Sequence, residues 1–183
     1  MPTSSQMRKI IYNWAIMSLA MLLSCDNNQN VGNVDSVIPM ISISLRNQQT
    51  AMLCIQAYNS HNVSEILKNW DSTAIDYGDG SGRPIKGVDS IKHVYSLVLK
   101  FLPGIRVDSL KTMSDNGEHV IVTGQWSGTI KNDSLKISDR KFNFWNGDFF
   151  TFNSVGKIVE HKSIQSHLGI LAQMGLLDKL KDK

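Results

Sequence analysis

The fold is decided by residues 120–130, which read VIVTGQWSGTI. Every second residue of this stretch is apolar or a glycine, so one face of an extended strand suits a core and the other suits water. The preceding Asp115-Asn116-Gly117 is typical of a tight hairpin turn, and residues 106–113 alternate in the same way. We therefore expect a long antiparallel hairpin whose second strand buries the face formed by Val120, Val122, Gly124, Trp126 and Gly128.

Three further strands are expected around this hairpin. Residues 136–152 and 157–165 form two extended stretches joined by the turn residues Asn153-Ser154-Val155-Gly156. A short early strand is expected near Ala74–Tyr77, where small or polar residues alternate with larger ones. The glycines and proline that follow it, up to Pro84, make a turn-rich connection.

Helices are expected mainly ahead of these strands. Apolar residues at three- and four-residue spacings predict helices over 45–60, 63–70, 88–101 and 168–174. Asn62 or Ser64 suits the N-cap of the second helix, and Pro103-Gly104 stops the third. Helices followed by long antiparallel strands indicate an α+β domain, whose sheet must bury one face against the helices. A strongly curved sheet makes that buried face a cone.

The N-terminus resembles a bacterial lipoprotein signal peptide. Arg8 and Lys9 precede the apolar run Ile10–Leu23, and Leu22-Leu23-Ser24-Cys25 closes it. The run is too short to cross a hydrocarbon core of roughly 30 Å at about 1.5 Å rise per residue. We expect a signal peptide over 1–24, lipidation with palmitate at Cys25, a flexible tether over 25–44 and one domain over 45–183. The protein would then be anchored to a membrane of the bacterial cell envelope.

Charge and cysteine content exclude several classes of function. The formal charge of +3 includes Arg8 and Lys9, so removal of the signal peptide leaves about +1 and no basic surface for nucleic acid. With Cys25 lipidated, Cys54 has no disulfide partner and is expected to be a small buried side chain. The histidines and cysteines follow no metal-binding spacing, and Gly78, Gly80 and Gly82 lack the rest of a phosphate loop, so no cofactor or metal is expected.

Several short motifs, in order, resemble the SnoaL-like branch of the NTF2-like superfamily, which includes polyketide cyclases and ester cyclases. The resemblance covers roughly Leu45–Leu176. Its motifs are Phe101-Leu102-Pro103-Gly104, Gly128-Thr129, Asp148-Phe149-Phe150-Thr151-Phe152, Gly156-Lys157-Ile158-Val159-Glu160-His161 and Gln173-Met174-Gly175. It implies a cone in which a curved antiparallel sheet wraps around N-terminal helices.

The resemblance also implies where cyclase chemistry would lie. The family's proton-transferring aspartate on the last strand corresponds to Ser166, and a pocket tryptophan four residues earlier corresponds to Lys162. The other two polar family positions are Gly104 and Ile130. Since none of Gly104, Ile130 and Ser166 can titrate, a cyclase mechanism copied from the family loses its acid–base groups, which typically supply about 10²–10⁴-fold in rate.

Other residues can take over such a role. Asp76, Lys162 and His161 are the candidate catalytic residues, because each can carry a proton and each lies on a strand that this fold brings to its cavity. His161, Ser163 and Gln165 share one face of the last strand, opposite Lys162 and Ser166. The resemblance puts the Ser166 face inside. The expected ligand-binding residues are Tyr58, Trp70, Trp126, Phe144, Lys162 and Ser166.

Three functional hypotheses follow. The first is an anchored domain that binds a small apolar ligand, or a partner, without cyclase chemistry. The second is a divergent isomerase, cyclase or hydrolase with a relocated acid–base residue, which a purely apolar pocket would contradict. The third is an interaction module that forms a homodimer, since sheets of this fold often pair face to face.

Overall fold

The computed structural model describes residues 34–80, 82–132 and 137–177. Apart from Val34, these residues belong to one compact unit, Asp35–Lys183. The signal peptide and Cys25 lie outside the described residues, as does the tether up to residue 33. No helix among the described residues is long and apolar enough to cross a membrane.

The helical elements come mostly before the sheet. They are α2 (Val34–Gln56), the 3₁₀ helix η1 (Ala57–Ser60), α3 (Val63–Ile66), α4 (Val88–Phe101) and α5 (His167–Gln173). The bounds of α4 match the prediction, and Asn62 caps α3 by accepting a hydrogen bond from the backbone N–H of Ser64 at 2.9 Å. Two expectations were wrong. The segment expected to be a flexible tether is helical from Val34 onward, and the second helix ends at Ile66 rather than running on to Trp70.

Six strands form one sheet in the order β2-β1-β6-β5-β4-β3. The strands are β1 (Trp70–Asp76), β2 (Ile85–Lys86), β3 (Arg106–Ser114), β4 (His119–Asn132), β5 (Ile137–Phe152) and β6 (Ile158–Ile164). All neighbours are antiparallel except β1 and β6, which are parallel. Strand β2 was not anticipated. The parallel pair matters most for function, because it joins an early strand to the last one.

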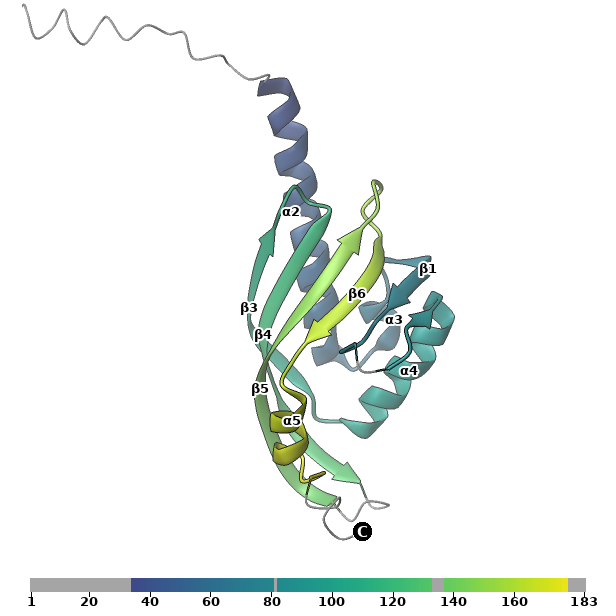
Figure 1. Ribbon diagram of the computed structural model, residues 1–183, viewed down its shortest axis with the longest axis vertical. Coiled ribbons are helices and arrows are strands. Elements are labelled where there is room, and N and C mark those ends of the chain that lie inside the picture. Colours follow the sequence, from purple (N-terminus) through teal and green to yellow (C-terminus); the bar gives the residue numbers. More distant parts are fainter. Residues whose placement is uncertain (1–33, 81, 133–136, 178–183) are drawn as a thin grey trace, which may run out of the picture. The chain divides into compact units, whose positions relative to one another are not determined.

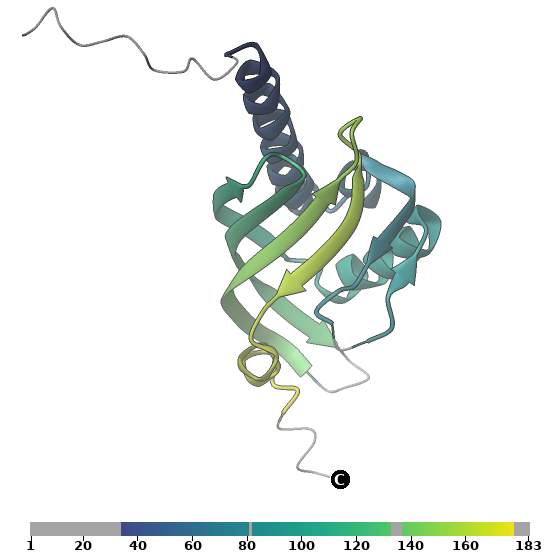
Figure 2. The ribbon, with the colours of Figure 1, turned by 45° about the horizontal axis from the view of Figure 1, so that its top comes forward.

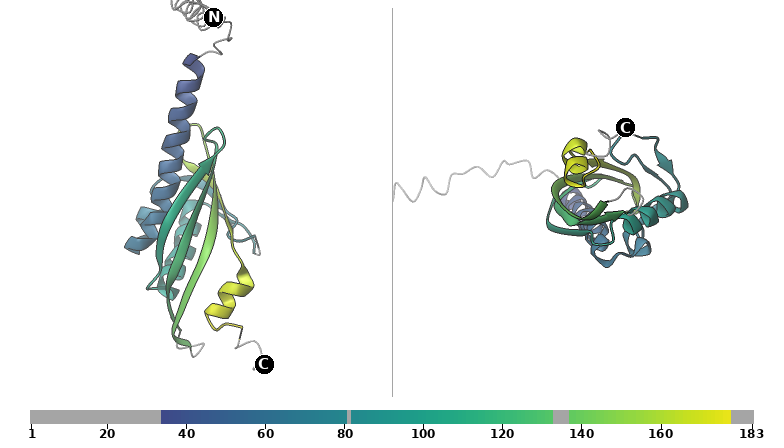
Figure 3. Two further views of the ribbon diagram at one scale, coloured as in Figure 1. Left: turned by 90° about the vertical axis from the view of Figure 1, so that its left-hand side faces the viewer. Right: turned by 90° about the horizontal axis from the view of Figure 1, so that it is seen from below.

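Long strands and irregular pairing curve the sheet. The β3–β4 register shifts between Asp108 and Lys111, where Ser109 has a φ of 54°, and the β4–β5 register shifts after Ile130. Bulges of this kind increase the local right-handed twist of a sheet. Figure 2 shows β4 and β5 sweeping around the interior as a result, and the view from below in Figure 3 places α4 and α5 at its rim.

The concave face of the sheet is the core. The β4 face predicted from the sequence is turned inward, with Val120, Val122 and Trp126 buried, and α4 covers it with Ile91, Tyr95 and Leu99 (Figure 1). Helix α2 is held to the β3–β4 hairpin by Asn47, whose side-chain amide donates to the carbonyl of Gly117 at 2.6 Å. The α+β cone with N-terminal helices and a curved, unclosed sheet is thereby confirmed.

Candidate functional site

Strand pairing brings together three ionisable residues that are distant in sequence. In the parallel β1–β6 pair, Asp76 is the register partner of His161. In the antiparallel β5–β6 pair, Asp148 is the register partner of Ser163, which lies two residues after His161 on the same face of β6. Side chains two residues apart share a face, so Asp76, Asp148 and His161 all point into the cone.

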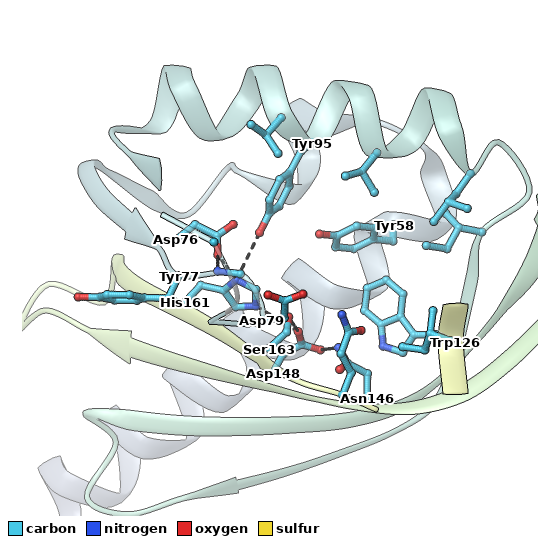
Figure 4. A pocket seen from close by; sticks show the side chains of 18 of the residues that line it. Tyr58, Asp76, Tyr77, Asp79, Tyr95, Trp126, Asn146, Asp148, His161 and Ser163 are labelled. Atoms are coloured by element: carbon cyan, nitrogen blue, oxygen red, sulfur yellow. Dashed lines mark hydrogen bonds and ion pairs between the residues drawn. The ribbon is translucent and has the colours of Figure 1, made fainter. Parts of the chain in front are cut away.

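The imidazole of His161 bridges the two carboxylates (Figure 4). Its Nδ1 lies 2.9 Å from Oδ1 of Asp76, and its Nε2 lies 3.1 Å from Oδ1 of Asp148. All three side chains are at most 7% exposed. Because a carboxylate can only accept, both contacts are satisfied as hydrogen bonds when both ring nitrogens carry a proton. The geometry therefore favours an imidazolium held between two anions.

Two opposing effects set the pKa of His161. Burial by itself disfavours the charged ring and lowers the pKa, but the hydrogen bonds and negative charges of Asp148 and Asp76 outweigh it and raise the pKa to about 9. For Asp76, burial raises the pKa, and the contacts with His161 and with the backbone N–H of Gly78, at 2.8 Å, outweigh it and lower the pKa. At neutral pH the imidazole of His161 is therefore protonated and the carboxyl group of Asp76 is ionised.

Asp148 accepts hydrogen bonds from three side chains. Besides His161, the hydroxyl of Ser163 donates to its Oδ1 at 2.9 Å, and the side-chain amide of Asn146 donates to its Oδ2 at 2.9 Å. Both supporting residues lie on β5 or β6, and both line the interior cavity. These three donors hold the carboxyl group of Asp148 in one orientation.

Aromatic side chains fix the imidazole and remove it from water. Trp70 meets the His161 ring edge to face at 5.7 Å between centroids, and Phe150 packs on it at 4.9 Å. Trp70 is itself held by its indole N–H, which donates to the sulfur of Cys54 at 3.4 Å. Cys54 is buried as expected, and burial raises the pKa of its thiol to about 12.

The group opens into a cavity of about 400 Å³ inside the cone. Tyr58 and Tyr95 face it from the helical side, and burial raises the pKa of both phenols well above 10, so both are neutral donors. Trp126 and Phe144 line its apolar side. Within the described residues, no group of three or more histidine, cysteine or carboxylate side chains is arranged to hold a metal ion.

The model of the SnoaL-like polyketide cyclase family matches residues 48–174, more than half of the chain. The chain belongs to this SnoaL-like family. No curated protein matches its sequence at a significant level.

Solved structures similar to this SnoaL-like chain share its fold at low sequence identity. A proposed polyketide cyclase from Xanthomonas campestris is 13% identical, covers 72% of this chain and 98% of its own, and superposes with a TM-score of 0.66. A phenazine biosynthesis-related protein from Pseudomonas aeruginosa is 14% identical over 76% of this chain and 91% of its own, with a TM-score of 0.63. A protein with a ketosteroid isomerase-like fold from Catenulispora acidiphila, in complex with trimethylamine, is 16% identical over 69% and 92%, with a TM-score of 0.60.

The family positions expected to carry SnoaL-like chemistry lie apart from the Asp76–His161–Asp148 group. Ile130 is fully buried, and Gly104 lies against the backbone of Thr129 and Gly128. Ser166 is exposed and stands at the N-cap of α5. These three positions contribute no side chain that can transfer a proton in the cavity.

The expected orientation of the last strand was wrong. His161, Ser163 and Gln165 line the cavity, whereas Lys162 is exposed on the outer face, where it pairs with Phe149. The physical reason is charge. Asp76 and Asp148 both face inward and compensate a buried imidazolium, while the opposite orientation would bury an ammonium and expose the histidine.

Of the other residues expected at the site, some line the cavity and others do not. Tyr58, Trp126 and Phe144 line the cavity, as do the candidates Asp76 and His161. Trp70 lies behind His161 rather than on the cavity wall, and neither Lys162 nor Ser166 lines this cavity.

Sequence reasoning missed four residues of the site: Asp148, Asn146, Ser163 and Tyr95. A signal for the first two was present in β5, where Asn146 and Asp148 alternate with the larger apolar Trp145 and Phe149 and precede Phe150. Between Trp145 and Phe149 the polar residues lie on the inward face and the aromatic residues on the outward face, which inverts the usual pattern that the rest of β5 follows. Such an inversion indicates that the inner face holds a polar site.

Proposed function

We propose that this SnoaL-like protein is an acid–base enzyme that moves a proton on a neutral small molecule, as an isomerase, cyclase or hydrolase does. The single observation that carries the proposal is the His161 imidazole bridging Asp76 and Asp148 at the wall of a cavity of about 400 Å³. General acid–base catalysis needs a group that gives a proton and a group that takes one, placed together at the substrate site.

Each group has a role that its environment favours. Asp148, fixed by three donors, is the proposed base that takes a proton from the substrate. His161 donates both of its ring N–H groups to Asp76 and Asp148, so it is the proposed proton source that acts through these carboxyl groups rather than by direct contact with the substrate. The neutral phenol of Tyr58 is the proposed donor for negative charge that develops on a substrate oxygen. Tyr95 has another role, because its hydroxyl lies 3.4 Å from Nδ1 of His161 and helps to position that ring.

A binding domain without chemistry is the competing proposal. The absence of titratable side chains at Gly104, Ile130 and Ser166 supports it. The polar lining of the cavity favours catalysis instead, because two buried carboxylates and a histidine cost more to bury than apolar side chains of similar size. A scaffold for a small apolar ligand would gain nothing from them.

Proton exchange tests the proposal while the natural substrate is still unidentified. The purified protein is incubated with 2-tetralone in deuterium oxide, and deuterium incorporation beside the carbonyl is followed by NMR; hydrolysis of styrene oxide is followed in parallel. We expect a rate above buffer for at least one probe. The rate should fall by about 10²-fold or more in Asp148→Asn and in His161→Gln.

The matched control is Lys162→Gln, which changes the exposed neighbour of His161 on the outer face. Its rate should equal that of the parent protein. Rates that match buffer for both probes, or that are the same in parent, Asp148→Asn and His161→Gln, would reject the enzyme and leave the binding domain.

We also propose that the protein is a lipoprotein of the cell envelope, anchored through Cys25. The support is the sequence from Arg8 to Cys25. Metabolic labelling with a palmitate analogue should mark the protein, and Cys25→Ser should abolish both the label and its recovery with membranes. Membrane recovery that survives Cys25→Ser would contradict this anchor.

A further inference from the structure

The first part of helix α2 carries apolar side chains that the rest of the compact unit leaves exposed. We call residues 35–45 the leading segment of α2; its only charged residue is Asp35. Its large exposed side chains are Met40, Ile41, Ile43 and Leu45, at 45%, 54%, 39% and 61%. The later part of the same helix differs, because its Ala51 and Ile55 are buried in the core. A contiguous apolar patch of this kind marks a surface that a partner covers.

The leading segment extends past the end of the sheet. A Cβ on Gly117 would lie 2.9 Å from the backbone of Ser44, and one on Gly156 would lie 2.7 Å from the guanidinium of Arg46, so the β3–β4 and β5–β6 turns both pack closely on α2 there. The helix before Ser44 continues beyond both turns (Figures 1 and 3). Val155, in the β5–β6 turn, is 74% exposed and adds apolar surface at the same end.

The length of chain back to Cys25 indicates what lies near this segment. Because α2 begins at Val34, only residues 26–33 separate it from Cys25. Eight residues span at most about 30 Å when fully extended and about 15–20 Å as a flexible chain. A lipid on Cys25 would therefore keep the start of α2 within about 30 Å of the membrane surface.

We propose that the leading segment of α2 lies on the lipid bilayer to which Cys25 is anchored, with Ile41 and Leu45 in the boundary between headgroups and acyl chains. This inference rests on the proposed lipidation of Cys25 and is independent of the proposed enzyme. Ile41 and Leu45 are one helical turn apart, and the helical period puts Val37 and Ile38 on the same side of α2. An apolar stripe along one side of a helix suits the plane of a membrane interface.

The contact is apolar rather than electrostatic. The leading segment holds no lysine or arginine, and its one charge is the acidic Asp35. Attraction between basic residues and anionic headgroups is screened by salt, whereas the burial of apolar side chains is not. The contact should therefore form on uncharged lipids and persist in about 0.5 M sodium chloride.

This arrangement leaves the cavity free. Helix α5, whose Ile170 lines the cavity, lies at the opposite end of the compact unit from the leading segment (Figure 1). A protein held to the bilayer through α2 thus turns the α5 end away from the lipid.

Hydrogen–deuterium exchange tests the contact whether or not a cell lipidates Cys25. The chain from Cys25 onward contains the whole compact unit and is coupled through the Cys25 thiol to a maleimide lipid in phosphatidylcholine vesicles. Cys54 does not compete, because it is buried and its pKa is raised to about 12. The reference is the same protein in solution with Cys25 blocked by N-ethylmaleimide. Amide exchange over residues 35–45 should slow by about threefold or more on the vesicles, while exchange in α4 stays the same.

Matched variants separate insertion from mere closeness to the vesicle. The double variant Ile41→Ser, Leu45→Ser removes the apolar stripe and should abolish the slowing. Its unfolding temperature should equal that of the parent, because both side chains are more than half exposed. Leu168→Ser removes a side chain that is 70% exposed in α5 and should leave the slowing intact.

Three outcomes would overturn the inference. They are equal exchange over residues 35–45 on vesicles and in solution, slowing that persists in the double variant, and slowing that high salt removes. Protection of this segment in solution that rises with protein concentration would assign it to a second copy of the chain, and the membrane contact would fall. Protection on vesicles without palmitate labelling of Cys25 in cells would retain the lipid-binding surface and reject the proposed anchor.

Discussion

The two faces of strands β5 and β6 reverse the usual rule for a sheet over two short stretches, residues 145–149 and 161–164, although the rest of their inward face is apolar. The inward face carries Asn146, Asp148, His161 and Ser163, all buried or half-buried. The outward face carries the apolar Trp145 and Ile164, which are 56% and 55% exposed. Strands normally turn their apolar side chains inward, so the reversal marks the interior as a place for polar chemistry.

The reversal has an energetic consequence. A charge in the interior is retained only when partners and hydrogen bonds compensate for lost water, and here each buried charge has at least two contacts. Side chains on the outward face keep their water and need no such partners. Changes on the inward face should therefore have large effects, and changes on the outward face small ones.

The largest effect on stability is expected at His161, and its neighbour Lys162 on β6 provides the comparison. His161→Ala leaves two buried carboxylates facing each other without a cation, so we expect the free energy of unfolding to fall by about 3–5 kcal/mol. Lys162→Ala, one residue along on the outward face, should change it by less than about 0.5 kcal/mol. Urea unfolding of both variants measures the difference. Equal effects would show that the His161 contacts contribute nothing special.

The next effect is the pH dependence of stability. The pKa of His161 is raised from 6.5 to about 9 by folding, so the folded state binds the proton more tightly than the unfolded state. This stabilisation is complete below pH 6.5 and is lost as the pH rises through 9; its size is on the order of 3 kcal/mol. Thermal unfolding between pH 6 and 9.5 measures it. His161→Gln should lose this slope, and a slope that persists in the variant would assign it to other groups.

A smaller effect on stability is expected when alanine replaces glycine, and two glycines on opposite faces of the sheet provide the comparison. A Cβ on Gly128 would lie 2.7 Å from the ring of Phe142 and 3.0 Å from the carbonyl of Gly104, whereas a Cβ on Gly147 would meet nothing closer than 3.9 Å. We expect Gly128→Ala to destabilise the protein by about 1–3 kcal/mol and Gly147→Ala to leave its stability nearly unchanged. Denaturant unfolding compares the two, and similar values would contradict the tight packing inferred at Gly128.

The smallest effect is expected on the outward face itself. Ile164→Thr keeps a β-branched side chain at an exposed strand position, so folding stability should change by less than about 0.5 kcal/mol. The same variant tests the homodimer expected from the resemblance. If the outward face forms the dimer contact, sedimentation velocity will find weaker self-association in Ile164→Thr than in the parent. Equal sedimentation of the two proteins would place any dimer contact elsewhere.

The sheet was largely predictable because its signals are local. Alternation along β3 and β4, the Asp115-Asn116-Gly117 turn and the stop at Pro103-Gly104 each depend on a few neighbouring residues. Errors arose where packing overrides a local pattern. Trp70 extends a helical stripe in the sequence, but in the fold it starts β1 and packs its ring on His161.

The sequence by itself determined the α+β class, the helix 88–101, the long hairpins and the presence of Asp76 and His161 on strands. Only the tertiary structure decided which face of β6 points inward and that Asp148 joins the two. The reason is that side chains alternate with a period of two, so a strand's sequence defines two faces without saying which one is buried. That choice depends on the partners supplied by β1 and β5, which are distant in the chain and meet β6 only in the folded sheet.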